Sequence, residues 1–183
     1  MKLSHFTDKQ AGGLLKHYES MFSDLQDKEM KYLEVGILKG GSIEWAHKFF
    51  KKGSIFGIDK IIDKEAKDLE KVASLSEVNQ GDVNGLKTYG ETFGKFDIIV
   101  DDASHIRELT ELTFVYLWPY VKSGGWYIIE DWSAGYSNLP EHKQYKGMVE
   151  LIARIITEKQ QCNIGEIKII NERKSFAAFQ KKD

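Results

Sequence analysis

The sequence predicts a doubly wound α/β fold with a mostly parallel, seven-stranded sheet and an antiparallel hairpin at the carboxyl end. Five strand-like apolar runs begin 19 to 30 residues apart, so each interval has room for the crossover helix that a parallel strand pair requires. Most of these runs are apolar at successive positions, which is typical of strands covered on both faces. Two further runs, joined by a short polar turn, predict the hairpin.

The predicted elements follow one another regularly along the chain. The parallel strands are expected at residues 32–35, 54–58, 77–80, 96–100 and 126–129, and the hairpin strands at 166–170 and 175–180. A leading helix is expected at 8–25, weakened by Gly12 and Gly13. Later helices are expected at 42–50, with Ser42 as cap, and at 64–73, 84–93, 107–120 and 147–160. A break at Ser123-Gly124-Gly125 is expected before the fifth strand.

Composition limits the class of protein. The length of 183 residues predicts one domain, residues 1–183, with residues 1–30 as a leading helical segment. A net charge of -2 disfavours general binding to nucleic acid or to an anionic membrane. A single cysteine, Cys162, excludes an internal disulfide and a multi-cysteine metal site. With no secretory signal and no apolar run of about 20 residues, we expect a cytoplasmic protein.

Right-handed crossovers place the carboxyl ends of the parallel strands along one rim, with a crevice where the strand order reverses. The first strand runs into the glycine-rich sequence EVGILKGGS, whose spacing differs from GxGxxG. Asp59 follows 23 residues after Gly36, which suits a ribose-binding carboxylate, and Asp82 lies at the next strand end. Helix capping and a plain turn are the simpler alternatives for these residues.

Acidic residues gather at the ends of the fourth and fifth strands. The group comprises Asp101, Asp102, His105, Glu130 and Asp131. Crowded carboxylates raise one another's pKa values, and a divalent cation would remove that cost. Oxygen ligands suit a hard ion such as Mg²⁺. Asp101 lies nearest the cofactor side and is expected to contact the cofactor. Capping of the following helices is the alternative for some of these acids.

These motifs together resemble the class I S-adenosylmethionine (SAM) methyltransferases, which have a Rossmann-like fold. The resemblance rests on EVGILKGGS, GIDK, GDV, FDIIVDDASH and GGWYIIEDW, and it covers nearly the whole chain. It implies that the methionine part of SAM lies among Gly36, Gly40, Gly41 and Ser42, with Glu34 beneath it. It also implies that Asp59 binds the ribose and that Asp82 lies near the adenine.

The sequences DDASH and IIEDW narrow the resemblance to the metal-dependent O-methyltransferases that act on sugars of macrolide and aminocoumarin natural products. Proteins called cephalosporin hydroxylases are relatives of that kind. The resemblance implies Asp102, Glu130 and Asp131 as Mg²⁺ ligands and His105 as the general base, with Asp102 also part of the catalytic centre. Ala103 stands where the family more often has glycine. Thr7-Asp8-Lys9 and Tyr18 resemble a segment preceding the core in those enzymes, with no role assigned.

The expected reaction is therefore SAM-dependent, Mg²⁺-assisted methylation of a hydroxyl on a sugar or another small molecule. One alternative is an NAD-dependent oxidoreductase or epimerase, which the glycine spacing and the lack of a YxxxK pair disfavour. Another is a non-catalytic nucleotide-binding subunit. Trp132 and Tyr136 are expected near the acceptor, and residues 133–146 form either a substrate loop or a surface connection. A homo-oligomer is compatible with the sequence.

Overall fold

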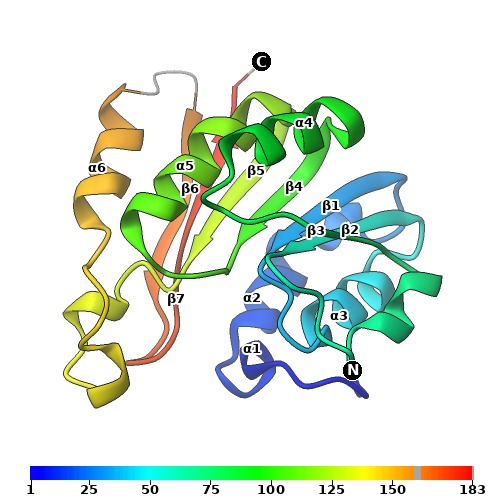
Figure 1. The fold of residues 1–183 in the computed structure, drawn as a ribbon, viewed down its shortest axis with the longest axis horizontal. Coiled ribbons are helices and arrows are strands. Elements are labelled where there is room, and N and C mark those ends of the chain that lie inside the picture. The colour runs from blue at the N-terminus through cyan, green and yellow to red at the C-terminus, as the bar shows by residue number, and fades with distance from the viewer. Residues whose placement is uncertain (159–161, 183) are drawn as a thin grey trace.

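The computed structural model describes residues 1–158 and 162–182 and confirms the doubly wound fold (Figure 1). One sheet has the strand order β3-β2-β1-β4-β5-β7-β6. Its parallel strands are β1 (Met30–Val35), β2 (Gly53–Asp59), β3 (Ser74–Glu77), β4 (Phe96–Asp101) and β5 (Val121–Glu130). The antiparallel strands are β6 (Cys162–Ile169) and β7 (Ser175–Lys181). The order reverses between β1 and β4, which places a crevice at their carboxyl ends.

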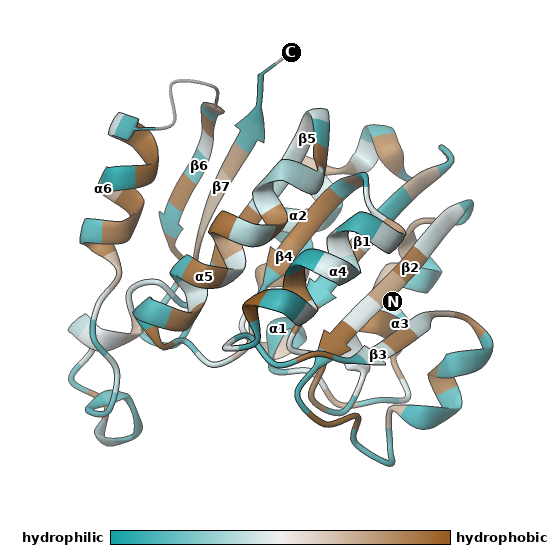
Figure 2. Cartoon of the chain, turned by 45° about the horizontal axis from the view of Figure 1, so that its top comes forward, coloured by the Kyte–Doolittle hydropathy of each residue, from teal (hydrophilic) through white to brown (hydrophobic). Residues whose placement is uncertain are grey.

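Helices cover both faces of the sheet and bury two apolar clusters. On one face lie α1 (Asp8–Ala11), α2 (Leu14–Met21) and α3 (Gly41–Phe49), and on the other lie α4 (Val83–Phe93), α5 (Arg107–Leu117) and α6 (Val149–Glu158). Tyr18 and Trp45 pack on the first face, whereas Phe114 and Tyr127 pack on the second. Figure 2 shows brown, apolar strands between helices that alternate brown and teal, the pattern of half-buried helices.

Several predicted boundaries were wrong. The third strand lies three residues earlier than predicted, pairing Ser74 with Phe56 and Glu77 with Asp59. The helix predicted at 64–73 is only a 3-10 turn, Lys67–Lys71, in the structure. The leading helix is split by Gly13, whose φ is 79°, and it ends in a 3-10 turn, Ser23–Leu25.

Three further boundaries differ more mildly. The N-cap of α3 is Gly40, with φ 86°, so Ser42 lies inside the helix instead of capping it. The end of the predicted helix at 107–120 is a 3-10 turn, Trp118–Tyr120. Strand β5 continues through the expected break at Gly124. The predicted end of the last helix at residue 160 lies outside the described residues. Within the described ranges, no helix has the length and apolarity needed to cross a bilayer.

Glu44 on α3 holds the chain's first residues against the fold. Its Oε2 atom accepts hydrogen bonds from the backbone N–H groups of Ser4 and His5, both at 2.8 Å. Its Oε1 atom lies 2.6 Å from the Lys48 Nζ atom. Burial alone would raise the pKa of Glu44, but bonds from Lys48 and His5 lower it to about 2. The ionised form is therefore the one that the fold stabilises.

Replacing Glu44 by glutamine should lower the free energy of unfolding at pH 7 and have little effect near pH 2. A carboxylate with a depressed folded-state pKa stabilises the fold above its unfolded value of 4.5 and loses that contribution as the pH falls through about 2. Urea unfolding at the two pH values measures the difference, with the exposed Glu91→Gln as control. Equal destabilisation at both pH values would contradict the assignment.

Candidate active site

A cavity of about 550 Å³ opens at the carboxyl ends of β1, β2 and β4. Its polar lining includes Ser42, Asp59, Asn79, Gln80 and His105. Apolar side chains such as Val35 and Ile58 complete the wall. The volume lies in the range of small-molecule and cofactor sites. The position agrees with the crevice expected where the strand order reverses.

The glycine loop after β1 lines this cavity and depends on Asp59. Gly36 has φ 88°, and a Cβ atom there would collide with the backbone of Asp102 and Ala103. The Asp59 Oδ2 atom accepts hydrogen bonds from the backbone N–H groups of Ile37 at 3.0 Å and Leu38 at 3.3 Å. Asp59 thus fixes the loop and also faces the cavity. Asp59, Gly36 and Ser42 are the predicted cofactor residues that line it.

The other two glycines of the motif shape the loop from behind. Gly40 caps α3 with φ 86° and packs beside Leu69. A Cβ atom at Gly41 would collide with the backbone oxygen of Phe6. Neither glycine lines the cavity. Both are needed because the start of α3 approaches neighbouring segments closely.

Three predicted cofactor acids also lie outside the lining. Asp82 is exposed and caps α4 by accepting a hydrogen bond from the Gly85 N–H at 3.0 Å. Asp101 is buried, and burial raises its pKa to about 8. Its Oδ1 atom accepts a hydrogen bond from the Gln80 Nε2 atom at 2.9 Å. Glu34 is buried beneath the loop. Gln80, to which the sequence assigned no role, bonds to Asp101 and is itself one of the polar residues that line the cavity.

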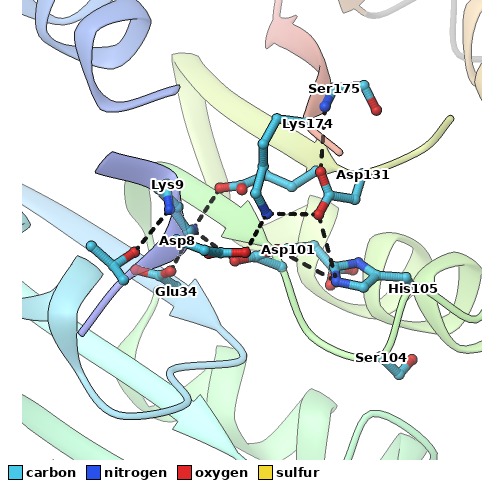
Figure 3. Close-up of polar contacts among 12 residues, drawn as sticks. Asp8, Lys9, Glu34, Asp101, Ser104, His105, Asp131, Lys174 and Ser175 are labelled. Carbon is cyan, nitrogen blue, oxygen red and sulfur yellow. Dashed lines mark hydrogen bonds and ion pairs between the residues drawn. The ribbon is translucent and has the colours of Figure 1, made fainter. Parts of the chain in front are cut away.

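The structure brings Asp102, His105 and Asp131 together (Figure 3). One nitrogen or oxygen from each residue lies within 4.8 Å of the others, a spacing that could hold a metal ion. The His105 Nε2 atom lies 3.8 Å from Asp102 Oδ1 and 3.8 Å from Asp131 Oδ2. His105 and Asp131 have φ values of 54° and 52°, which are strained for side chains other than glycine. Such strain concentrates at functional sites.

A second cavity, of about 560 Å³, adjoins the first at this cluster. The two cavities share Asp8, His105, Tyr145 and Lys174 in their walls. Further polar side chains in the lining of the second cavity are Glu141, His142, Gln144, Asn171 and Arg173. Part of the wall comes from the segment 133–146. This arrangement places His105 between two adjoining ligand-sized spaces.

Aromatic residues of this segment lie differently than predicted. Trp132 packs against the core. Tyr136 is exposed, and its hydroxyl oxygen accepts a hydrogen bond from the Val149 N–H at 3.2 Å. Neither residue lines a cavity described above. Tyr145 does, with its ring edge-on to His105 at 5.8 Å. The loop 138–146 turns Tyr145 inward, which a polar, proline-containing sequence does not reveal.

Two of the curated proteins that are similar to this chain are O-methyltransferases. The chain is 35% identical over 126 residues to mycinamicin VI 2''-O-methyltransferase of Micromonospora griseorubida. It is 37% identical over 127 residues to demethylmacrocin O-methyltransferase of Streptomyces fradiae. Each match covers 64% of this chain and 31% of the relative. No family model matches the sequence.

Solved structures agree with these relatives. MycE methyltransferase of the mycinamycin pathway, in complex with Mg and S-adenosylhomocysteine (SAH), superposes with a TM-score of 0.71 at 25% identity, covering 91% of this chain and 48% of MycE. Its complex with Mg, SAH and mycinamycin VI gives 0.69 at 27% identity, covering 92% and 50%. This chain shares the fold of MycE methyltransferase. It spans about a third of the length of the curated relatives it matches.

Glu130 lies outside the cluster of Asp102, His105 and Asp131 and contacts Lys9 and Tyr18. Its Oε1 atom accepts hydrogen bonds from Lys9 Nζ at 2.6 Å and from the Tyr18 hydroxyl at 2.9 Å. Its Oε2 atom is buried and has no hydrogen-bond partner among the described residues. A buried carboxylate oxygen without a partner is costly unless a cation or donor reaches it.

Two lysines, to which the sequence assigned no role, lie among the acids of this site. Lys9 Nζ contacts Glu34, Glu130 and Asp102. Lys174 Nζ lies 2.9 Å from Asp131 Oδ2 and 2.8 Å from the Asp8 Oδ2 atom. For Lys9 the only signal in the sequence was the resemblance of Thr7-Asp8-Lys9 to a segment preceding the core of those enzymes. Lys174, in the hairpin turn, carried no signal.

The acids of the candidate site remain crowded despite these lysines. Burial and the nearby Asp102 raise the pKa values of Glu130 and Asp131 above the ordinary range. For Asp102, burial is outweighed by Lys9 and His105, which lower its pKa. Crowded carboxylates with a bare oxygen on Glu130 fit a hard, oxygen-preferring dication. The residues present are therefore compatible with Mg²⁺.

Proposed function

We propose that this chain is a SAM-dependent methyltransferase domain that methylates a hydroxyl oxygen of a sugar or another small molecule with the help of Mg²⁺. The junction of the two cavities carries the proposal, because Asp102, His105 and Asp131 converge there within 4.8 Å. The names of the relatives support a glycosylated acceptor. The polar side chains that line the second cavity, such as Glu141 and Arg173, suit a ligand with hydroxyl groups.

In this proposal the first cavity, at the carboxyl ends of β1, β2 and β4, binds SAM and the second cavity binds the acceptor. Gly36, Ser42 and Asp59 contact the donor directly, and Asp59 also holds the loop in shape. Indirect support comes from residues behind the cavity wall: Glu34, Gly40, Gly41, Asp82 and Asp101. Placing the donor and the acceptor in adjoining spaces would orient them for transfer, which removes much of the entropic barrier.

Asp102, Asp131 and the free oxygen of Glu130 would hold the ion. When bound, the ion would lower the pKa of an acceptor hydroxyl and orient it. His105 is the general base in this scheme and takes the hydroxyl proton at Nε2. Asp102 Oδ1 and Asp131 Oδ2 each lie 3.8 Å from that nitrogen. The side chain of His105 is 19% exposed, so the proton can leave to solvent through a cavity.

The remaining features of the proposal concern partners and place. A cavity of about 560 Å³ suits a small molecule, and a net charge of -2 gives no general attraction to nucleic acid. A cytoplasmic location and a homo-oligomer stay predictions. Mycinamicin VI, the acceptor in the name of one relative, is a suitable probe acceptor.

Isothermal calorimetry with SAM and with NAD tests the donor site. We expect the chain to bind SAM and to give no heat with NAD. Asp59→Ala should weaken SAM binding by at least about tenfold, because each 1.4 kcal/mol lost is a factor of ten and the loop loses two hydrogen bonds. The exposed Asp27→Ala should bind like the wild type. Binding of NAD with no heat from SAM would refute the methyltransferase proposal.

A further inference from the structure

Lys9 lies at the centre of the acidic group. Its side chain is 2% exposed, and its Nζ atom lies 2.6 Å from Glu34 Oε1, 2.6 Å from Glu130 Oε1 and 3.0 Å from Asp102 Oδ2. Burial alone would lower the pKa of Lys9, but the three carboxylates raise it well above its usual value. Lys9 is thus a fixed positive charge bonded to the carboxyl ends of β1, β4 and β5 (Figure 3).

Lys9 contacts one oxygen of each of the three carboxylates, and the second oxygen of each does not contact Lys9. On Glu130 the remaining oxygen is buried and has no partner among the described residues. On Asp102 the remaining oxygen faces His105 Nε2 at 3.8 Å. On Glu34 the remaining oxygen accepts a hydrogen bond from the Tyr32 hydroxyl at 3.0 Å, so Glu34 has none to offer. Lys9 therefore leaves one oxygen of each proposed ligand, Asp102 and Glu130, available.

We propose that Lys9 is a positioning residue of the metal site. It fixes the carboxylates of Asp102 and Glu130 relative to each other, so that their remaining oxygens can bind one divalent ion, and it joins both to Glu34 beneath the donor loop. This inference rests on the proposed function. Partners that orient metal ligands from behind act in this way in other metal sites. Without Lys9, three buried carboxylates would face one another with no cation to hold them.

Binding of Mn²⁺ alone, measured by calorimetry or electron paramagnetic resonance, tests the proposal without a turnover assay. Lys9→Met should bind Mn²⁺ about tenfold or more weakly than the wild type, the usual effect of losing such a partner. Lys9→Arg keeps the charge and its donors and should recover most of the affinity. Lys51→Met, which removes an exposed ion pair with Asp27, is the matched control and should bind normally.

A double variant separates positioning from simple charge balance and guards against misfolding. Lys9→Met with Glu34→Gln removes one charge of each sign, so it should unfold at a higher temperature than Lys9→Met yet still bind Mn²⁺ weakly. Wild-type affinity in the double variant, or equal or tighter binding by Lys9→Met, would overturn the proposal. A wild-type chain that binds SAM but not Mn²⁺ would refute the metal site and this proposal together. Mn²⁺ binding unchanged by Lys9→Met would refute only the role of Lys9.

Discussion

Replacing Asp102 by asparagine is expected to abolish detectable Mn²⁺ binding and to slow methyl transfer to mycinamicin VI by about a hundredfold to a thousandfold. Asp102 lies between the positioning residue and the proposed base, since it contacts Lys9 at 3.0 Å and faces His105 at 3.8 Å. The amide loses the negative charge that would bind the ion. An ion that polarises the acceptor contributes several kcal/mol, and each 1.36 kcal/mol is a factor of ten in rate. Single-turnover transfer of labelled methyl from SAM measures the effect.

The same variant separates the two halves of the site. Asp102 lines the donor cavity, but asparagine has nearly the same shape as aspartate, so SAH binding by Asp102→Asn should stay within about threefold of the wild type, a difference of less than 1 kcal/mol. Asp27→Asn is exposed and should leave both measurements unchanged. Unaltered turnover and metal affinity in Asp102→Asn would show that the site is assigned to the wrong residues.

Replacing His105 by glutamine is expected to lower the rate of methyl transfer by about 10²- to 10⁴-fold, the usual contribution of a general base. Mn²⁺ affinity should be nearly unchanged, because the proposed ligands are carboxylates. SAH affinity should also be retained. The measurements are single-turnover rates at saturating SAM and Mn²⁺ binding to the chain alone.

His47→Gln, on the outer side of α3, serves as the histidine control, because His47 is exposed. Loss of Mn²⁺ affinity in step with activity in His105→Gln would make His105 a metal ligand instead of the base, which the 4.8 Å cluster would also allow. Full activity in this variant would remove His105 from the mechanism.

The order of strands and helices along the chain could be predicted from the sequence better than the residues at which each of them begins and ends. The run 96–100 predicted a buried strand, because a strand that is covered by helices on both sides of the sheet needs apolar side chains on both of its faces. Strand β3 could not be placed from its own residues, since Ser74 and Ser76 are polar and its register is set by pairing with β2. The 3-10 turn at Lys67–Lys71 illustrates the same limit, because the length of the crossover overrides helical spacing.

The candidate site was predictable in so far as strand ends carry chemistry. Asp59, Asp102, His105 and Asp131 could be predicted because each follows a recognisable strand. Lys9 could not, since its bonds to Glu34 and Glu130 span 25 and 121 residues of chain. The orientation of Glu130 toward Lys9 follows from that same distant contact.

The central claim is that an ion lies between the acids that end β4 and β5, beside a donor in the cavity lined by Gly36 and Asp59. A crystal structure of the chain with Mn²⁺ and SAH, with the metal located by anomalous scattering, tests it most directly. The account predicts an anomalous peak within bonding distance of Asp102 and Asp131, and density for SAH along Gly36 and Asp59. SAH in that cavity with the anomalous peak elsewhere would contradict the account. SAH in that cavity with no metal ion, so that Lys9 and Lys174 are the only cations among the acids, would also contradict it.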